Sequence, residues 1–210
     1  SHTLDCVGLF ARSLDDIALL AETLCGYDER DTDTRPRARI PFARVLGEEP
    51  PMAPTFALAK TPMWERADAA TREAFAEVAE VLGERCEEVD LGESIRSAWD
   101  WHRCIMEAEM AAHLELEWSK GRERLSESLR QQLARGREVL ALDYQQALAR
   151  IPKLNDGFDE LFQRYDAILT PAATGPAPQG HHATGNPIFC TAWTYLGLPA
   201  VTLPLLASEQ

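Results

Sequence analysis

The sequence lacks several patterns that mark particular classes of enzyme. It has no Gly-x-Ser-x-Gly nucleophile turn, no glycine-rich phosphate loop and no dinucleotide-binding fingerprint. Its only lysines are Lys60, Lys120 and Lys153, and none is surrounded by serines in a Ser-Lys arrangement. The serines stand at predicted helix caps, on helix surfaces or near the ends of the chain, where capping and solvation explain them. The residues alone therefore indicate no nucleophile with its base.

Long apolar runs and paired cysteines are also missing. No stretch reaches the roughly 18 apolar residues of a membrane span, and no signal peptide opens the chain. The five cysteines are odd in number and never form a Cys-x-x-Cys pair, which is typical of a reduced, cytoplasmic protein. The formal net charge of −13 argues against nucleic acid and anionic membrane as partners, because both require a basic face.

Strand-like and helical segments alternate along the chain. The expected strands are residues 7–11, 56–60, 86–91, 167–170 and 200–203. Ser13 and Asp68 are expected to cap the helices that follow the first two strands. A strand, a helix and a strand between residues 56 and 91 make a βαβ unit, which implies parallel strands. The order predicts an α/β fold: part of a mixed, largely parallel sheet covered by helices, with a helical insertion.

Two long segments interrupt this alternation. Residues 27–54 contain five prolines and are expected to form a surface connection with room for one short helical turn. Residues 97–164 are expected to form the helical insertion, with a break at 120–121 and a last short helix beginning near Pro152. A loop rich in Gly, Pro and His is expected at 172–185, after the fourth strand.

One group of side chains has the composition of a metal site. His102, Glu109 and His113 share a helix face at spacings of seven and four, and zinc or iron accepts such ligands. Metalloprotease helices instead place two histidines four residues apart with the acid between them. We therefore expect a solvated helix face, and neither a metal nor another cofactor.

Cys190 lies near His181 and His182 and raises the alternative of a thiol hydrolase. A cysteine nucleophile needs a base within hydrogen-bonding distance, which nearness in sequence does not provide. The neighbouring Phe189 and Trp193 favour a buried core cysteine instead.

Three segments together resemble the amidase signature family. Residues 1–16 match its "S-x-x-x-D-x-x-G-x-x-A-R-S-x-x-D" run, and residues 165–172 match its "Y-D-x-L-L-x-P" strand. Residues 193–204 are similar to its "N-x-x-G-x-P-A-x-x-x-P" strand, although Trp193 replaces the frequent asparagine. Each motif is weak by itself, but their order and spacing along nearly the whole chain make the resemblance fairly specific.

This resemblance implies a hydrolase of carboxamides that uses a nucleophilic serine, a second serine and a lysine. In the family these residues precede the first matching segment, so here they would lie upstream of Ser1. We therefore expect residues 1–210 to be the carboxy-terminal portion of such a domain, inactive alone. We carry over no catalytic residue onto this sequence.

The resemblance also implies a pocket wall on the acyl or amide side of the substrate. Its residues here would be Thr170, Pro171, Ala172, Phe189 and Trp193. The expected partners are a small-molecule amide and the upstream half of the enzyme, with self-association where sheet edges lack neighbours. The alternative is a non-catalytic binding or partner module that uses the same half-fold.

Overall fold

A computed structural model of the chain describes residues 3–31 and 34–207 and divides into two compact units. The first unit comprises Ser1–Asp5 and Pro54–Gln210, and the second comprises Cys6–Ala53. The first unit contains the sheet and the long helices, while the second contains two shorter helices.

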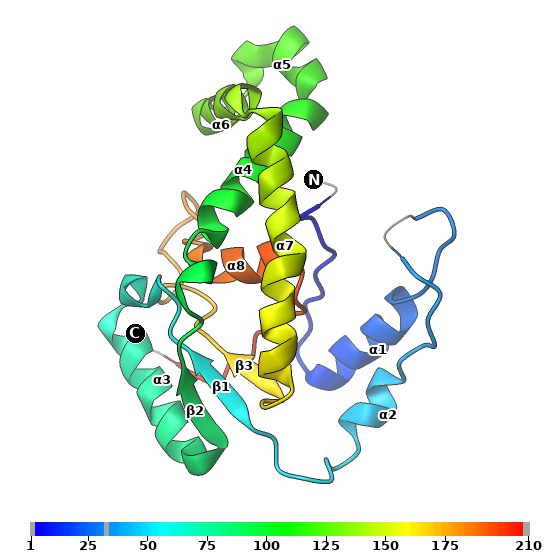
Figure 1. Ribbon diagram of the computed structural model, residues 1–210, viewed down its shortest axis with the longest axis vertical. Coiled ribbons are helices and arrows are strands. Elements are labelled where there is room, and N and C mark those ends of the chain that lie inside the picture. The colour runs from blue at the N-terminus through cyan, green and yellow to red at the C-terminus, as the bar shows by residue number, and fades with distance from the viewer. Residues whose placement is uncertain (1–2, 32–33, 208–210) are drawn as a thin grey trace. The chain divides into compact units, whose positions relative to one another are not determined.

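A parallel sheet of three short strands is the centre of the first unit. These strands are β1 (Phe56–Ala59), β2 (Cys86–Val89) and β3 (Ala167–Leu169), in the spatial order β2-β1-β3 (Figure 1). Both pairings are parallel, and Phe56 stands opposite Cys86 on one side and Ala167 on the other. The predicted α/β class and the predicted parallel pairing of the βαβ unit are confirmed.

Helix α3 (Ala69–Leu82) connects β1 to β2 and begins at the predicted cap. The Asp68 carboxylate accepts a hydrogen bond from the Thr71 amide at 2.7 Å, which satisfies one free N–H of the first turn. Ala74, Val78 and Leu82 are half-buried, but Val81 is 83% exposed. Because these three residues are each four positions apart, they form one stripe along the helix. Val81 lies beside this stripe, so its side chain points away from it.

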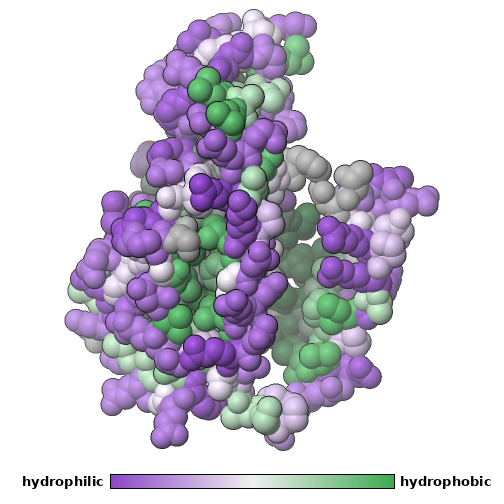
Figure 2. All heavy atoms as spheres, viewed as in Figure 1, coloured by the Kyte–Doolittle hydropathy of each residue, from purple (hydrophilic) through white to green (hydrophobic). Residues whose placement is uncertain are grey.

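The helical insertion consists of four helices. They are α4 (Ala98–His113), α5 (Glu115–Gly121), α6 (Glu127–Glu138) and α7 (Ala141–Phe162). Short 3-10 turns occupy Trp64–Arg66, Gly83–Arg85, Glu93–Ile95 and Arg122–Arg124. Helices α5 and α6 lie at the end of the insertion that is remote from the sheet, where the visible surface is mostly hydrophilic (Figures 1 and 2). The predicted break falls where α5 ends, at Gly121.

The prediction that a separate helix begins near Pro152 is wrong. Helix α7 runs for 22 residues with Pro152 in its interior. An interior proline removes one helical hydrogen bond and crowds the preceding turn, at a cost of about 3 kcal/mol. Ile151, Leu154 and Phe158 pack into the core on both sides of it, and this burial holds the helix together.

Helix α8 (Ile188–Leu196) lies between α4 and α7 and completes the core of the first unit (Figure 1). Tyr195 is 1% exposed, and its hydroxyl donates to the Ala147 carbonyl of α7 at 2.6 Å. Gly197 ends the helix with φ of 67°, a left-handed conformation that glycine adopts without steric cost.

Two predicted strands are absent from the part of the chain that the structure describes. Residues 7–11 and 200–203 have no regular secondary structure, and Phe10 and Val201 are 96% and 71% exposed. Their apolar composition is typical of strands, but a strand exists only when a neighbour completes its hydrogen bonds. Neither segment has such a neighbour among residues 3–31 and 34–207.

The second unit contains α1 (Leu14–Leu24) and α2 (Phe42–Leu46). Ser13 caps α1 as predicted, because its hydroxyl accepts a hydrogen bond from the Asp16 amide at 3.2 Å. The two helices pack together, and the Glu22 carboxylate accepts from the Ala43 amide at 3.0 Å. Most of residues 27–53 are exposed, as expected of a surface connection with one short helix.

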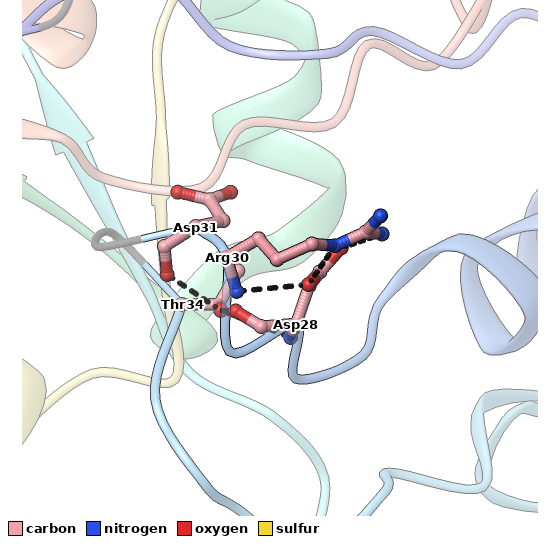
Figure 3. Close-up of polar contacts among 4 residues, drawn as sticks. All are labelled: Asp28, Arg30, Asp31 and Thr34. Atoms are coloured by element: carbon pink, nitrogen blue, oxygen red, sulfur yellow. Dashed lines mark hydrogen bonds and ion pairs between the residues drawn. The ribbon is translucent and has the colours of Figure 1, made fainter.

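A polar turn follows α1 (Figure 3). The Arg30 guanidinium donates to both carboxylate oxygens of Asp28, at 2.9 and 2.7 Å, and lowers the pKa of that carboxyl group. The Thr34 hydroxyl donates to the carbonyls of Asp28 and Asp31, at 2.8 and 3.1 Å. These bonds are local, as is typical of Asp and Thr side chains in turns.

Candidate functional site

The carboxyl ends of the parallel strands define the candidate site. Open α/β sheets bind ligands at this edge, because the loops that leave the strands converge there. Lys60 and Thr61 follow β1, and Thr170 and Pro171 follow the neighbouring strand β3. The loop that contains most of the predicted site residues therefore leaves the sheet at the expected edge.

The three predicted residues that follow β3 differ in exposure. Pro171 is fully buried, Thr170 is half-buried and Ala172 is exposed. The Thr170 hydroxyl oxygen is shielded from solvent and has no hydrogen-bond partner among the described residues. The Thr170 hydroxyl is therefore unsatisfied in this chain, and an unpaired buried polar group costs about 1–3 kcal/mol of folding free energy.

The two predicted residues of α8 face the core. Phe189 is 1% exposed and Trp193 is 8% exposed. The Trp193 ring meets Phe158 of α7 edge-on, with ring centroids 6.0 Å apart. Its indole N–H is also buried without a hydrogen-bond partner among the described residues. Only Ala172 of the five predicted side chains is exposed, so their role as substrate contacts stays a prediction.

Cys190 joins α8 to the loop after β3. Its thiol donates to the Ala172 carbonyl at 3.2 Å, and partial burial of the thiol raises its pKa. The residue as a whole is exposed, so the prediction of a core cysteine is wrong. Cys190 occurs in the first turn of α8, where its side chain points towards the loop while Phe189 points inwards. A thiol whose pKa is raised is a weak nucleophile, which disfavours thiol chemistry.

The three residues weighed as metal ligands have other contacts. Glu109 is 7% exposed and accepts hydrogen bonds from the Thr3 hydroxyl and from Tyr144, the latter at 2.9 Å. His113 Nδ1 lies 2.8 Å from the carbonyl oxygen of Glu109, and burial lowers the pKa of His102. The expectation of a solvated face is therefore wrong at Glu109, which ties the start of the chain to α4 and α7. The residues that the structure describes contain no group of three potential metal ligands.

Three of the described serines and the lysine at the sheet edge have structural contacts. Ser13 and Ser126 cap α1 and α6, and Ser119 donates to the Leu116 carbonyl. The Lys60 ammonium lies 2.5 Å from a Glu88 carboxylate oxygen.

A feature that sequence reasoning missed is a cavity of about 290 Å³ at the carboxyl ends of β1 and β2. Lys60, Glu88, Asp90 and Arg96 are among the residues that line it. Its two cations are already paired with carboxylates, so the cavity carries no free positive charge for an anion. A larger cavity of about 490 Å³ lies on the surface of α6, away from the sheet edge.

Comparison with known proteins identifies the family. The model of the amidase family matches residues 1–210. The chain belongs to this family. A glutamyl-tRNA(Gln) amidotransferase subunit from Lachnoclostridium phytofermentans is 24% identical over 244 residues, which cover 100% of this chain and 49% of that relative. Its counterpart from Agathobacter rectalis is 25% identical, over 96% and 46%. The chain thus spans about half the length of the curated relatives it matches.

Solved structures share the fold of this amidase-family chain. A chain of an inhibitor-bound complex, described for the evolutionary origins of an s-triazine catabolic enzyme, superposes with a TM-score of 0.75 and 18% identity. That match covers 89% of this chain and 43% of the other. The structure of 6-aminohexanoate cyclic dimer hydrolase gives 0.62 at 18% identity, over 90% and 45%. At such identities the likeness shows the fold alone. No helix among the described residues is long and apolar enough to cross a membrane.

Proposed function

We propose that this chain is the carboxy-terminal portion of an amidase, which hydrolyses a carboxamide to an acid plus ammonia or an amine. The observation that carries the proposal is the amidase-family match over residues 1–210. A serine outside these residues attacks the amide carbonyl, and a serine-lysine pair accepts its proton. The C–N bond breaks, the amine leaves with that proton, and water then hydrolyses the acyl-serine ester.

The contacts of this chain's own hydroxyl and ammonium groups support a catalytic centre outside it. Ser13 and Ser126 accept hydrogen bonds from helix amides, and Lys60 is paired with Glu88. A nucleophilic serine requires a base within hydrogen-bonding distance. The role that we assign to this chain is to shape the substrate side of the pocket.

We assign that role to Thr170, Pro171, Ala172, Phe189 and Trp193. The Thr170 hydroxyl and the Trp193 indole N–H support the assignment, because both are buried polar groups that have no hydrogen-bond partner in the described part of the chain. A bound amide offers a carbonyl acceptor and an N–H donor, which are the complements of such groups. Pro171 and Phe189 are buried and would support the wall from behind.

The proposed partner is the upstream half of the same enzyme. The segments 7–11 and 200–203, which were predicted as strands, pair with no strand among the described residues, and Val7 and Val201 are 86% and 71% exposed. Apolar segments with open backbone groups accept a neighbouring strand readily, which also favours self-association of the isolated chain. All five cysteines are free, which suits the reducing cytoplasm where we place the protein.

Co-expression tests this proposal. The chain is produced alone and together with the polypeptide encoded immediately upstream, and ammonia release is measured with aliphatic and aromatic primary amides. We expect the chain alone to be inactive, because the groups that supply most of the rate enhancement in acyl transfer lie elsewhere. The pair should form a complex with amidase activity.

Two outcomes would contradict the proposal. Turnover by the chain alone that disappears in Cys190→Ala would support a thiol hydrolase instead. A compact monomer that unfolds cooperatively and ignores the upstream polypeptide would support the binding-module alternative.

A further inference from the structure

Two elements hold the loop that leaves β3 within its first few residues. The backbone N–H of Asp68, at the start of α3, donates to the Thr174 carbonyl at 2.8 Å. The Cys190 thiol of α8 donates to the Ala172 carbonyl at 3.2 Å. Two elements that are far apart in the sequence therefore hold residues 172–174.

The contact between Asp68 and the loop is close enough to require glycine at the next position. A Cβ atom built on Gly175 would lie 2.2 Å from Asp68 Oδ2 and 3.0 Å from Asp68 Cγ. The Asp68 carboxylate has little freedom to retreat, because its other oxygen accepts the Thr71 amide hydrogen bond that caps α3. Gly175 thus lies directly against the start of α3.

The remainder of the loop contrasts with this held part. Residues 176–187 are exposed at every position. Gly180 and Gly185 have φ angles of 85° and 93°, which favour glycine. The loop therefore has a held base, residues 172–175, and an exposed remainder.

We infer that Asp68 is a positioning residue for the proposed substrate site, because it holds the Ala172–Gly175 base as a fixed rim beyond Thr170. Cys190 holds the same rim from α8. This inference rests on the proposed function. A rim that is fixed before the substrate arrives lowers the entropy lost on binding, so loosening it raises KM more than it lowers kcat.

The backbone geometry permits two substitutions at position 68 that differ in whether the anchoring N–H is kept. Asp68 has φ of −67°, which proline adopts, and the preceding Ala67 has an extended conformation, which proline tolerates. Asp68→Pro and Asp68→Ala both lose the side-chain cap of α3. Only Asp68→Pro also loses the donor to Thr174, and its ring occupies the place of the hydrogen bond. The comparison of these two variants isolates the anchor from the cap.

The first measurement is the alkylation rate of Cys190, resolved by peptide mass spectrometry in the otherwise unchanged chain. A loosened rim hydrates the thiol, which lowers its pKa and increases the reactive thiolate. We expect Asp68→Pro to react about threefold faster than Asp68→Ala, because the more hydrated thiol is more often the reactive thiolate. Gly175→Ala should accelerate it similarly, because the new Cβ displaces the loop from Asp68. Cys25, which is exposed in the second unit, is the internal reference.

The second measurement is steady-state kinetics of the co-expressed complex. Asp68→Pro should raise KM at least threefold relative to Asp68→Ala, with a smaller change in kcat. Gly157→Ala is the matched glycine control, because that residue is exposed in α7 with nothing within 4 Å of its added Cβ. Equal Cys190 rates in Asp68→Pro and Asp68→Ala, together with an unchanged rate in Gly175→Ala, would overturn the inference. An inactive wild-type complex would instead refute the proposed function, and the alkylation rates would still decide whether Asp68 holds the rim.

Discussion

The contact between α4 and α6 gives a stability prediction whose size follows from the structure. Gly136 is buried where α6 crosses α4, and the side chain of Arg135 beside it pairs with the buried Glu107. A Cβ atom at position 136 would lie 1.9 Å from the Glu107 carbonyl oxygen and 3.0 Å from Ala111 Cβ. Both the carbonyl oxygen and the methyl group belong to a rigid helix. We therefore predict that Gly136→Ala forces the two helices apart.

The expected loss follows from that distance. Cβ atoms do not approach neighbouring atoms closer than 3.0 Å, so the helices must separate by about 1 Å, the difference between 3.0 and 1.9 Å. Overpacking of this kind costs roughly 1–3 kcal/mol and occasionally more, while the better helix propensity of alanine returns only about 1 kcal/mol. A shift of this size also weakens the Arg135–Glu107 ion pair. We expect a net loss of about 2 kcal/mol, or roughly 4–8 °C in Tm.

Thermal unfolding and urea titration of wild type, Gly136→Ala and Gly157→Ala provide the assay. The control makes the same chemical change at an exposed position of α7 with no neighbour within 4 Å, so it should stabilise the chain by up to about 1 kcal/mol. The two variants should therefore shift Tm in opposite directions. If Gly136→Ala raises Tm as much as Gly157→Ala does, the close approach of α4 and α6 is refuted.

Two further predictions concern a helix cap and a buried phenol. Ser126→Ala removes the hydroxyl that accepts a hydrogen bond from the Leu129 amide at 3.3 Å. In urea titrations this variant should lose about 1 kcal/mol of unfolding free energy. Ser128→Ala, at an exposed position of the same helix, should show no such loss. Burial raises the pKa of Tyr195 from 10.0 to about 12, so its contribution to stability is complete below pH 10 and is lost as the pH rises to 12. Urea titrations between pH 9 and 12 should show a fall in the free energy of unfolding that is smaller by about 2–3 kcal/mol in Tyr195→Phe than in the wild type. An identical fall in both proteins would contradict the pKa shift.

Local signals in the sequence predicted the elements that depend on local chemistry. Ser13 and Asp68 cap helices as expected, because an N-cap requires only a side-chain oxygen and the next three residues. The parallel βαβ unit also followed from the sequence, because the connection between its strands is short and contains a capped amphipathic helix.

The errors fall where a distant part of the chain decides the structure. Residues 200–203 have the composition of a strand, but no neighbouring strand is present in the described residues. Pro152 interrupts a helix in isolation, yet the core contacts of Phe158 and its neighbours keep α7 continuous. Glu109 looked like a surface carboxylate because Thr3 and Tyr144, which bury it, are 106 and 35 residues away in the sequence.

For the candidate site, the sequence located the loop but not the direction of its side chains. Ala172 is exposed, whereas Phe189 and Trp193 are buried, and apolar residues line pockets and cores with the same composition. The hold of Asp68 on the loop was also invisible in the sequence, because it passes through a backbone N–H and a glycine. Both contacts depend on where the backbone lies in the folded chain, and the residue types alone do not reveal this.

A comparison of two tryptophans separates a pocket residue from a core residue at position 193. Trp99 and Trp193 both contact the core, but the Trp99 indole N–H donates to the Ile188 carbonyl at 2.7 Å, while that of Trp193 has no partner among the described residues. Replacement by phenylalanine removes the same atoms from each tryptophan, so the lost side-chain volume is similar. The difference between the two losses of unfolding free energy therefore reports the Trp99 hydrogen bond. Trp99→Phe should lower the free energy of unfolding by about 1–2 kcal/mol more than Trp193→Phe, because only Trp99→Phe breaks a bond.

The same pair of variants then tests function in the co-expressed complex. If the Trp193 N–H serves a substrate amide, Trp193→Phe should lower kcat/KM by about tenfold, equivalent to about 1.4 kcal/mol, while it loses less unfolding free energy than Trp99→Phe does. An equal loss of stability in the two variants would mean that Trp193 already has a hydrogen-bond partner. An unpaired buried N–H costs folding free energy, and a hydrogen bond to a substrate carbonyl would offset that cost.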